Sequence, residues 1–156
     1  MASWSRLEAE APELSALARR ILDRHIHKTL ATLRRDGSPR ISGTEVIFAE
    51  GELWIGSMPR AVKARDLQRD PRFALHSASE EMPGGEGDAK LAGRAEEATE
   101  IETKRAVFGA EYTDRGAHLF RLDVAELVVT AVGDPPDHLL IRSWHEGRGE
   151  TALRRK

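Results

Sequence analysis

Residues 28–77 constrain the fold most, because apolar residues recur at every second position in three segments of this stretch. Segments 29–33, 41–48 and 53–57 show this pattern and contain many β-branched residues, which favour strands. An Asp-Gly-Ser-Pro motif separates the first two segments, and a Glu-Gly-Glu turn separates the second from the third. The block therefore predicts three antiparallel strands joined as a meander.

A short helix is predicted after the third strand. The pattern over residues 60–70 is helical and turns Val62, Ala64 and Leu67 toward the core. An Asp-Pro pair ends this helix, because the residue before a proline is displaced from the α region. Phe73 then begins a fourth predicted strand.

The rest of the chain repeats these two patterns. Helices are expected over residues 8–24 and 98–108, and an acidic, glycine-rich loop over 79–88. Four further segments have the strand pattern: 90–95, 118–124, 126–132 and 138–144. Gly93 lies inside the first of these, where it marks a bulge or a close approach of two backbones. Residues 146–156 are expected to form a polar tail.

The length and the order of the elements limit the fold. The 156 residues suffice for one domain with a buried core, which we place over residues 1–156 with the N-terminal helix in 1–24. Mostly antiparallel strands with flanking helices predict a mainly β fold of the α+β class, closed as a small barrel. Neither GxGxxG nor GxxxxGK[ST] occurs, which excludes Rossmann and P-loop sites.

Charge and composition exclude several classes of function. The formal net charge is -2, so no overall positive field favours nucleic acid. The chain has no cysteine, which removes disulfides, thiolate catalysis and cysteine-type zinc sites. No apolar run approaches the roughly 18 residues that a membrane span requires, and the N-terminus lacks the pattern of a signal peptide. We therefore expect a cytoplasmic protein that binds neither nucleic acid nor membrane.

Lys63 is the first candidate for ligand binding, because it stands near the start of the helix predicted at 60–70. There its ammonium adds to unpaired backbone N–H groups, and together they favour an anion such as phosphate. Arg40 would converge with Lys63 on one ligand if strands 41–48 and 53–57 lay side by side. The other cations near the helix are interpreted as a solvated basic face: Arg65, Arg69 and Arg72.

Histidines and the C-terminal tryptophan give weaker signals. His25 and His27 form a His-x-His pair, but no third ligand stands at a suitable spacing, so we expect no metal site. No GxSxG elbow exists for a Ser-His-Asp triad, and no catalytic residue is identified. Trp144 is interpreted as the plug of a terminal strand, with a ring that covers a flat ligand as the alternative.

Two stretches carry a resemblance to a known family. KTLATLRRDGSPRIS and GELWIGSMPRAVKARDLQRDPRFAL together resemble the pyridoxamine 5'-phosphate oxidase-like family, which comprises flavin- and deazaflavin-binding split β-barrels. The resemblance covers residues 25–77 well and the remainder only by the order of its elements. It implies a six-stranded split β-barrel of the FMN-binding type and a homodimer with a cofactor at the interface.

The resemblance also implies roles for particular residues. Lys63 matches the family lysine that grips the cofactor phosphate, and Arg40 matches the arginine at the start of the second strand. Ile41, Ser42 and Gly43 match the family strand that lies along the isoalloxazine ring of the cofactor. Gly56 and Ser57 match the strand end that meets the ribityl phosphate.

Two features depart from the family pattern. Members that bind FMN tightly often have Ser-Arg before the lysine, whereas Ala61-Val62 stand here, so Arg60 is a hypothetical substitute. The tail lacks the RLxP-type ending of true pyridoxamine phosphate oxidases, so that specific activity is not expected.

The resemblance therefore implies a flavin-binding oxidoreductase that transfers hydride to or from a small molecule, with FMN as cofactor. One alternative keeps the fold and replaces FMN by the deazaflavin coenzyme F-420. Another is a non-catalytic carrier or sensor that binds flavin or haem. The missing arginine before Lys63 favours these alternatives slightly.

Overall fold

The computed structural model describes residues 2–79 and 86–156, and residues 80–85 of the predicted acidic loop lie outside this part. Four helices are present in it: α1 (Trp4–Glu10), α2 (Pro12–Asp23), α3 (Val62–Arg69) and α4 (Ile101–Phe108). Nine strands accompany them: β1 (Lys28–Leu33), β2 (Pro39–Thr44), β3 (Ile47–Ala49), β4 (Glu52–Ser57), β5 (Arg72–His76), β6 (Asp88–Glu97), β7 (His118–Val132), β8 (Leu139–His145) and β9 (Gly149–Arg155). None of the four helices is long and apolar enough to cross a membrane.

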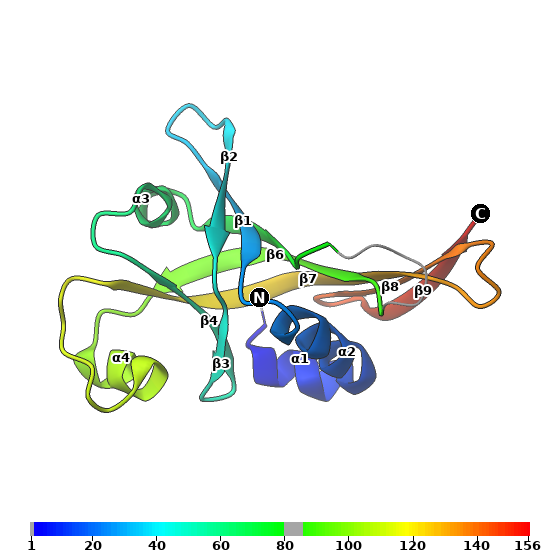
Figure 1. Ribbon diagram of the computed structural model, residues 1–156, viewed down its shortest axis with the longest axis horizontal. Helices are drawn as coiled ribbons and strands as arrows, with labels where there is room; N and C mark the ends of the chain where they lie inside the picture. The colour runs from blue at the N-terminus through cyan, green and yellow to red at the C-terminus, as the bar shows by residue number, and fades with distance from the viewer. Residues whose placement is uncertain (1, 80–85) are drawn as a thin grey trace.

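The strands form one antiparallel sheet in the order β2-β1-β5-β6-β7-β4-β3, with β8 added to β7 and β9 to β8. Six neighbours, β2 through β4, correspond to the expected six-stranded barrel, and β3, β8 and β9 extend it. The barrel is split because β2 contacts β4 without pairing with it. Helices α1 and α2 lie together beside the long strands (Figure 1).

The predicted helix over 8–24 is wrong in its bounds, because the structure has two helices there. α1 begins after Ser3, whose hydroxyl oxygen accepts a hydrogen bond from the Arg6 backbone N–H at 3.2 Å. Ala11 separates the helices with a non-helical backbone, and Pro12 opens α2. Proline suits this position because a first-turn N–H has no partner within the helix.

The predicted meander is also wrong. Segment 41–48 divides into β2 and β3, with Glu45 and Val46 between them. β2 pairs with β1, while β3 pairs with β4, whose other neighbour is β7. Alternation shows which side chains share a face of a strand, but it does not determine which strand lies alongside.

The helix predicted at 60–70 starts later, at Val62. Arg60 has a φ of 62°, which a right-handed helix excludes. Ala64 and Leu67 are buried as predicted, but the Val62 side chain is 52% exposed and does not face the core.

Gly93 marks both predicted features, a bulge and a close approach of backbones. The register of β6 and β7 shifts between Ala92 and Gly93, so that Ala92 pairs with Glu126 and Gly93 with Val124. A Cβ at Gly93 would lie 1.9 Å from the Asp123 carbonyl oxygen, which leaves room only for glycine. The bulge lets β7 run unbroken from His118 to Val132, where two strands were predicted.

The C-terminal segment is not a polar tail over its whole length, because residues 149–155 form β9 and pair with β8. Trp144 on β8 is fully buried, and its indole Nε1 donates a hydrogen bond to Glu10 Oε2 at 3.2 Å. It belongs to the core that α1 and α2 close, together with Trp4 and Leu14. Its interpretation as a structural plug is therefore confirmed.

Candidate functional site

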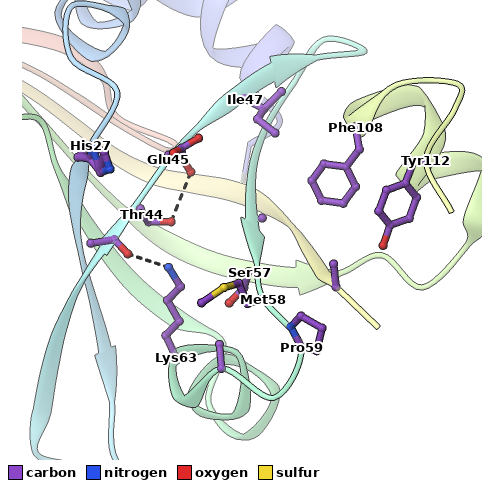
Figure 2. A pocket seen from close by; sticks show the side chains of 14 residues that line it. His27, Thr44, Glu45, Ile47, Ser57, Met58, Pro59, Lys63, Phe108 and Tyr112 are labelled. Carbon is purple, nitrogen blue, oxygen red and sulfur yellow. Dashed lines mark hydrogen bonds between the residues drawn. The ribbon is translucent and has the colours of Figure 1, made fainter. Parts of the chain in front are cut away.

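A cleft of about 690 Å³ opens where the barrel is split, between β2 and β4, and continues toward α3 and α4 (Figure 2). Its lining is largely apolar, with a smaller group of polar side chains. The apolar and aromatic lining residues are Ile47, Met58, Pro59, Ala61, Phe108, Tyr112 and Ala117. The polar ones are His27, Thr44, Glu45, Ser57 and Lys63, and Gly43 and Gly56 complete the wall. An apolar cleft with a few converging polar groups is the usual form of a small-molecule site.

Lys63 extends from the first turn of α3 toward β2, and its Nζ donates a hydrogen bond to the Gly43 carbonyl oxygen at 2.7 Å (Figure 2). This bond fixes the ammonium at the wall of the cleft. Burial lowers the pKa of Lys63, and the nearby Glu45 carboxylate partly opposes that effect.

A second pocket of about 380 Å³ shares Lys63 and Ala61 with the main cleft. Its other lining residues are Arg34, Arg40, Ile41, Ser42 and Val62. Three cations line it, and its described lining includes no acidic side chain. Lys63 therefore stands where an apolar cleft meets a cationic pocket, and this junction suits a ligand with a flat apolar part and an anionic end.

Asp66, a buried residue of α3, holds the Arg40 side chain in place by an ion pair. Its side chain is 3% exposed, and its Oδ2 accepts hydrogen bonds from Arg40 Nε at 2.7 Å and Thr32 Oγ1 at 2.9 Å. Its Oδ1 accepts one from Arg69 Nη2 at 2.9 Å. The Arg40 Nη groups have no partner in the part of the chain that the structure describes, so they remain available to a ligand.

Asp66→Asn is expected to destabilise the protein by about 1–2 kcal/mol at pH 7, because it weakens three hydrogen bonds to a buried carboxylate. Burial alone would raise the pKa of Asp66, but the bonds from Arg40, Arg69 and Thr32 outweigh it and hold that pKa below its usual value. The unfolded chain therefore binds the proton more readily. The contribution of Asp66 is complete above pH of about 4 and is lost as the pH falls through its folded pKa.

Urea unfolding of both proteins at pH 7 and pH 3 tests this expectation. The difference in unfolding free energy between wild type and Asp66→Asn should shrink at pH 3. Asp23→Asn, at an exposed position at the end of α2, serves as control and should change stability by less than about 0.5 kcal/mol. An equal difference at both pH values would contradict the role of the ionised Asp66.

Two serine hydroxyls at the site are buried without a hydrogen-bond partner in the described part of the chain: Ser42 Oγ and Ser57 Oγ. Ser57 lines the main cleft, and Ser42 lines the second pocket. Burying a hydroxyl without a partner costs about 1–3 kcal/mol, so such groups mark places where a ligand or water completes the bonding.

The structure brings together all the predicted site residues except Arg60. Gly43, Gly56, Ser57 and Lys63 line the main cleft, and Arg40, Ile41 and Ser42 join Lys63 in the second pocket. Arg60 lines neither. Arg40 and Lys63 do converge. The expected pairing of 41–48 with 53–57 holds only for residues 47 and 48 in β3, while β2, which carries Arg40, contacts β4 without pairing with it.

Sequence reasoning missed the far wall of the cleft. Phe108 is the last residue of α4 and packs against Tyr112, with 5.0 Å between the two ring centroids. A Cβ at Gly56 would lie 3.1 Å from Phe108 Cε1, so the glycine lets this ring approach β4. The sequence indicates His27 only as half of a His-x-His pair, and no local pattern marks Glu45 as a site residue. The described residues contain no group of three or more His, Asp or Glu side chains arranged to hold a metal ion.

Comparison with known proteins agrees with this geometry. A family model described as pyridoxamine 5'-phosphate oxidase matches residues 14–134. No curated protein matches the chain in sequence.

Several solved structures share the fold. A pyridoxamine 5'-phosphate oxidase-related, FMN binding protein from Nostoc punctiforme has a TM-score of 0.65 at 11% identity, and the match covers 94% of this chain and 96% of that one. PhzG from Burkholderia lata, in complex with tetrahydrophenazine-1-carboxylic acid, has a TM-score of 0.65 at 13% identity, with 96% and 90% covered. A heme binding protein from Mycobacterium smegmatis has a TM-score of 0.55 at 20% identity, with 89% and 86% covered. The predicted class, a mainly β split barrel with flanking helices, is confirmed.

Proposed function

Because this chain belongs to the pyridoxamine 5'-phosphate oxidase-like family, we propose that its main cleft binds FMN and that the loaded protein is an oxidoreductase. The observation that carries the proposal is the junction at Lys63. An apolar cleft and a cation-lined pocket meet there, and each has a buried serine hydroxyl without a partner.

The residues present fit the two ends of FMN. Lys63, Arg40 and Arg34 would hold the phosphate, with the Ser42 hydroxyl as a further hydrogen-bond partner. Arg40 presents its Nη groups because Asp66 holds its Nε. The apolar wall that includes Phe108 would exclude water from the ring.

FMN, when bound, supplies hydride transfer, and the protein supplies binding and orientation. Arg60 is not needed in this arrangement. The second pocket offers Arg34 and Arg40 in the role that a Ser-Arg pair before Lys63 was expected to fill.

A homodimer is part of the proposal, since three apolar side chains beside the two pockets face solvent in the single chain. Ile41 is 73% exposed, Met58 78% and Val62 52%. Each lines the cleft or the second pocket, so a second copy packed there would bury apolar surface and enclose the cofactor.

Sedimentation at micromolar concentration is expected to show a dimer. Ile41→Glu should shift the dimer toward monomer by about tenfold or more, because it places a charge in an apolar interface. Leu153→Glu, an exposed leucine on β9, is the matched control and should leave the dimer intact. A monomeric wild-type protein would contradict this part of the proposal.

The visible spectrum of the purified protein, with identification of any released cofactor, tests the cofactor itself. The proposal predicts flavin absorption bands and released FMN. A colourless protein that binds added coenzyme F-420 but not FMN would favour the deazaflavin alternative, whose longer anionic tail suits the cation-lined pocket. Binding of haem alone would favour a carrier or sensor.

A further inference from the structure

The loop between α4 and β7, residues 109–117, is tied to α4 by an ion pair that lies outside the cationic pocket. Lys104 on α4 is buried, with a side chain that is 9% exposed, and its Nζ donates a hydrogen bond to Asp114 Oδ2 at 3.3 Å. Burying an ammonium is costly unless a charged group faces it. The pair therefore holds the loop against the helix.

Asp114 also fixes the loop internally. Its Oδ1 accepts a hydrogen bond from the Gly116 backbone N–H at 2.8 Å and one from the Tyr112 hydroxyl at 3.4 Å. The bond from Gly116, and after it the bond from Lys104, hold the pKa of Asp114 below its usual value, so its carboxylate is ionised at neutral pH. One carboxylate therefore connects the helix, the loop backbone and the Tyr112 side chain.

Tyr112 connects this loop with the cleft. Its ring lines the main cleft beside Phe108, and Ala117 at the end of the loop lines it as well. Figure 2 shows the two rings on one side of the cleft and Lys63 on the other. Because Tyr112 lines the main cleft and not the cationic pocket, its ring would meet the flat part of a ligand rather than its anionic end.

We propose that Asp114 is a positioning residue, which holds the Tyr112 ring in the wall of the cleft before a flavin binds. A ring that is already in place loses less conformational entropy when a ligand packs against it, and this strengthens binding. The inference rests on the proposed function, since it assigns a residue to the ring end of the same flavin site. It requires equal effects on FMN and riboflavin, because both carry the same ring.

Fluorescence titration of the cofactor-free protein with FMN and with riboflavin tests the inference. Tyr112→Ala is expected to weaken the binding of both flavins by about fivefold or more, because the ring contact is lost. Asp114→Ala should weaken the binding of both by about threefold or more, and Lys104→Met should do the same from the other side of the ion pair. The ratio of the two Kd values should remain that of the wild type in all three variants.

A double-mutant cycle separates an effect through Tyr112 from a general loss of structure. Asp114→Ala should have no further effect on flavin binding once residue 112 is alanine, since no ring is then left to position. Asp137→Ala in the β7–β8 turn is the control, because it removes the same charge at a residue that lines neither pocket. This variant should bind both flavins with wild-type affinity.

Wild-type affinity in Asp114→Ala, or an undiminished effect of Asp114→Ala in the Tyr112→Ala background, would overturn the inference. A loss confined to FMN would also overturn it, since that result would assign the effect to the phosphate. Each of these results leaves the flavin site itself in place. A wild-type protein that bound neither flavin would instead remove the proposed function, and this inference with it.

Discussion

FMN binding is expected to weaken by about 1–3 kcal/mol, or about 5- to 150-fold in Kd, when Lys63 is replaced by alanine. The Lys63 ammonium is hydrogen-bonded to the Gly43 carbonyl oxygen at the junction of the two pockets, where the phosphate of FMN would meet it. Alanine has no charged group in its place. The substitution should weaken FMN binding with little effect on the stability of the fold, because Lys63 is only half-buried and contributes little to the core. A fluorescence titration with FMN measures it.

Lys90→Ala is the matched control for this experiment. Lys90 is an exposed lysine on β6 that lines neither pocket, so the variant loses the same charge away from the site. Its FMN affinity should equal that of the wild type. If Lys63→Ala also bound FMN with wild-type affinity, Lys63 would have no part in the site.

Gly93→Ala is expected to lower the free energy of unfolding by about 3 kcal/mol or more, the largest effect on stability that we predict. The added Cβ would lie 1.9 Å from the Asp123 carbonyl oxygen and 3.2 Å from the Ala125 backbone N, so backbone must move. The bulge there sets the register of β6 against β7, the longest pairing in the sheet. Denaturant unfolding monitored by circular dichroism measures the loss.

Gly43→Ala on β2 provides the comparison, because nothing lies within 4 Å of the Cβ it would add. Its stability should remain within about 0.5 kcal/mol of the wild type. A Gly93→Ala protein as stable as Gly43→Ala would show that the two strands separate at the bulge without cost.

The sequence predicted the positions of the helices and strands better than it predicted which strands pair with each other. Alternation correctly marked 29–33 and 53–57 as strands, and the Asp-Pro pair correctly marked the end of α3. The meander failed because contacts between distant segments determine strand order. β1 pairs with β5 and β4 with β7, across intervals that no local pattern describes.

The site was predictable where a residue's role depends on its own element. Lys63 stands in the first turn of a helix, which its sequence position already indicated. Arg40 reaches the same pocket because Asp66 on α3 accepts a hydrogen bond from its Nε. No local pattern predicts this contact, since the two residues lie on different elements. Phe108 was missed since only the packing of α4 beside β3 brings it to the cleft.

Titration of the cofactor-free protein with FMN and with riboflavin, which lacks the phosphate, tests the central claim most directly. That claim is a flavin site anchored by its phosphate at Lys63. It predicts saturable binding of one FMN per chain and at least about tenfold weaker binding of riboflavin. Equal affinities for the two flavins, or no saturable binding of FMN, would contradict it.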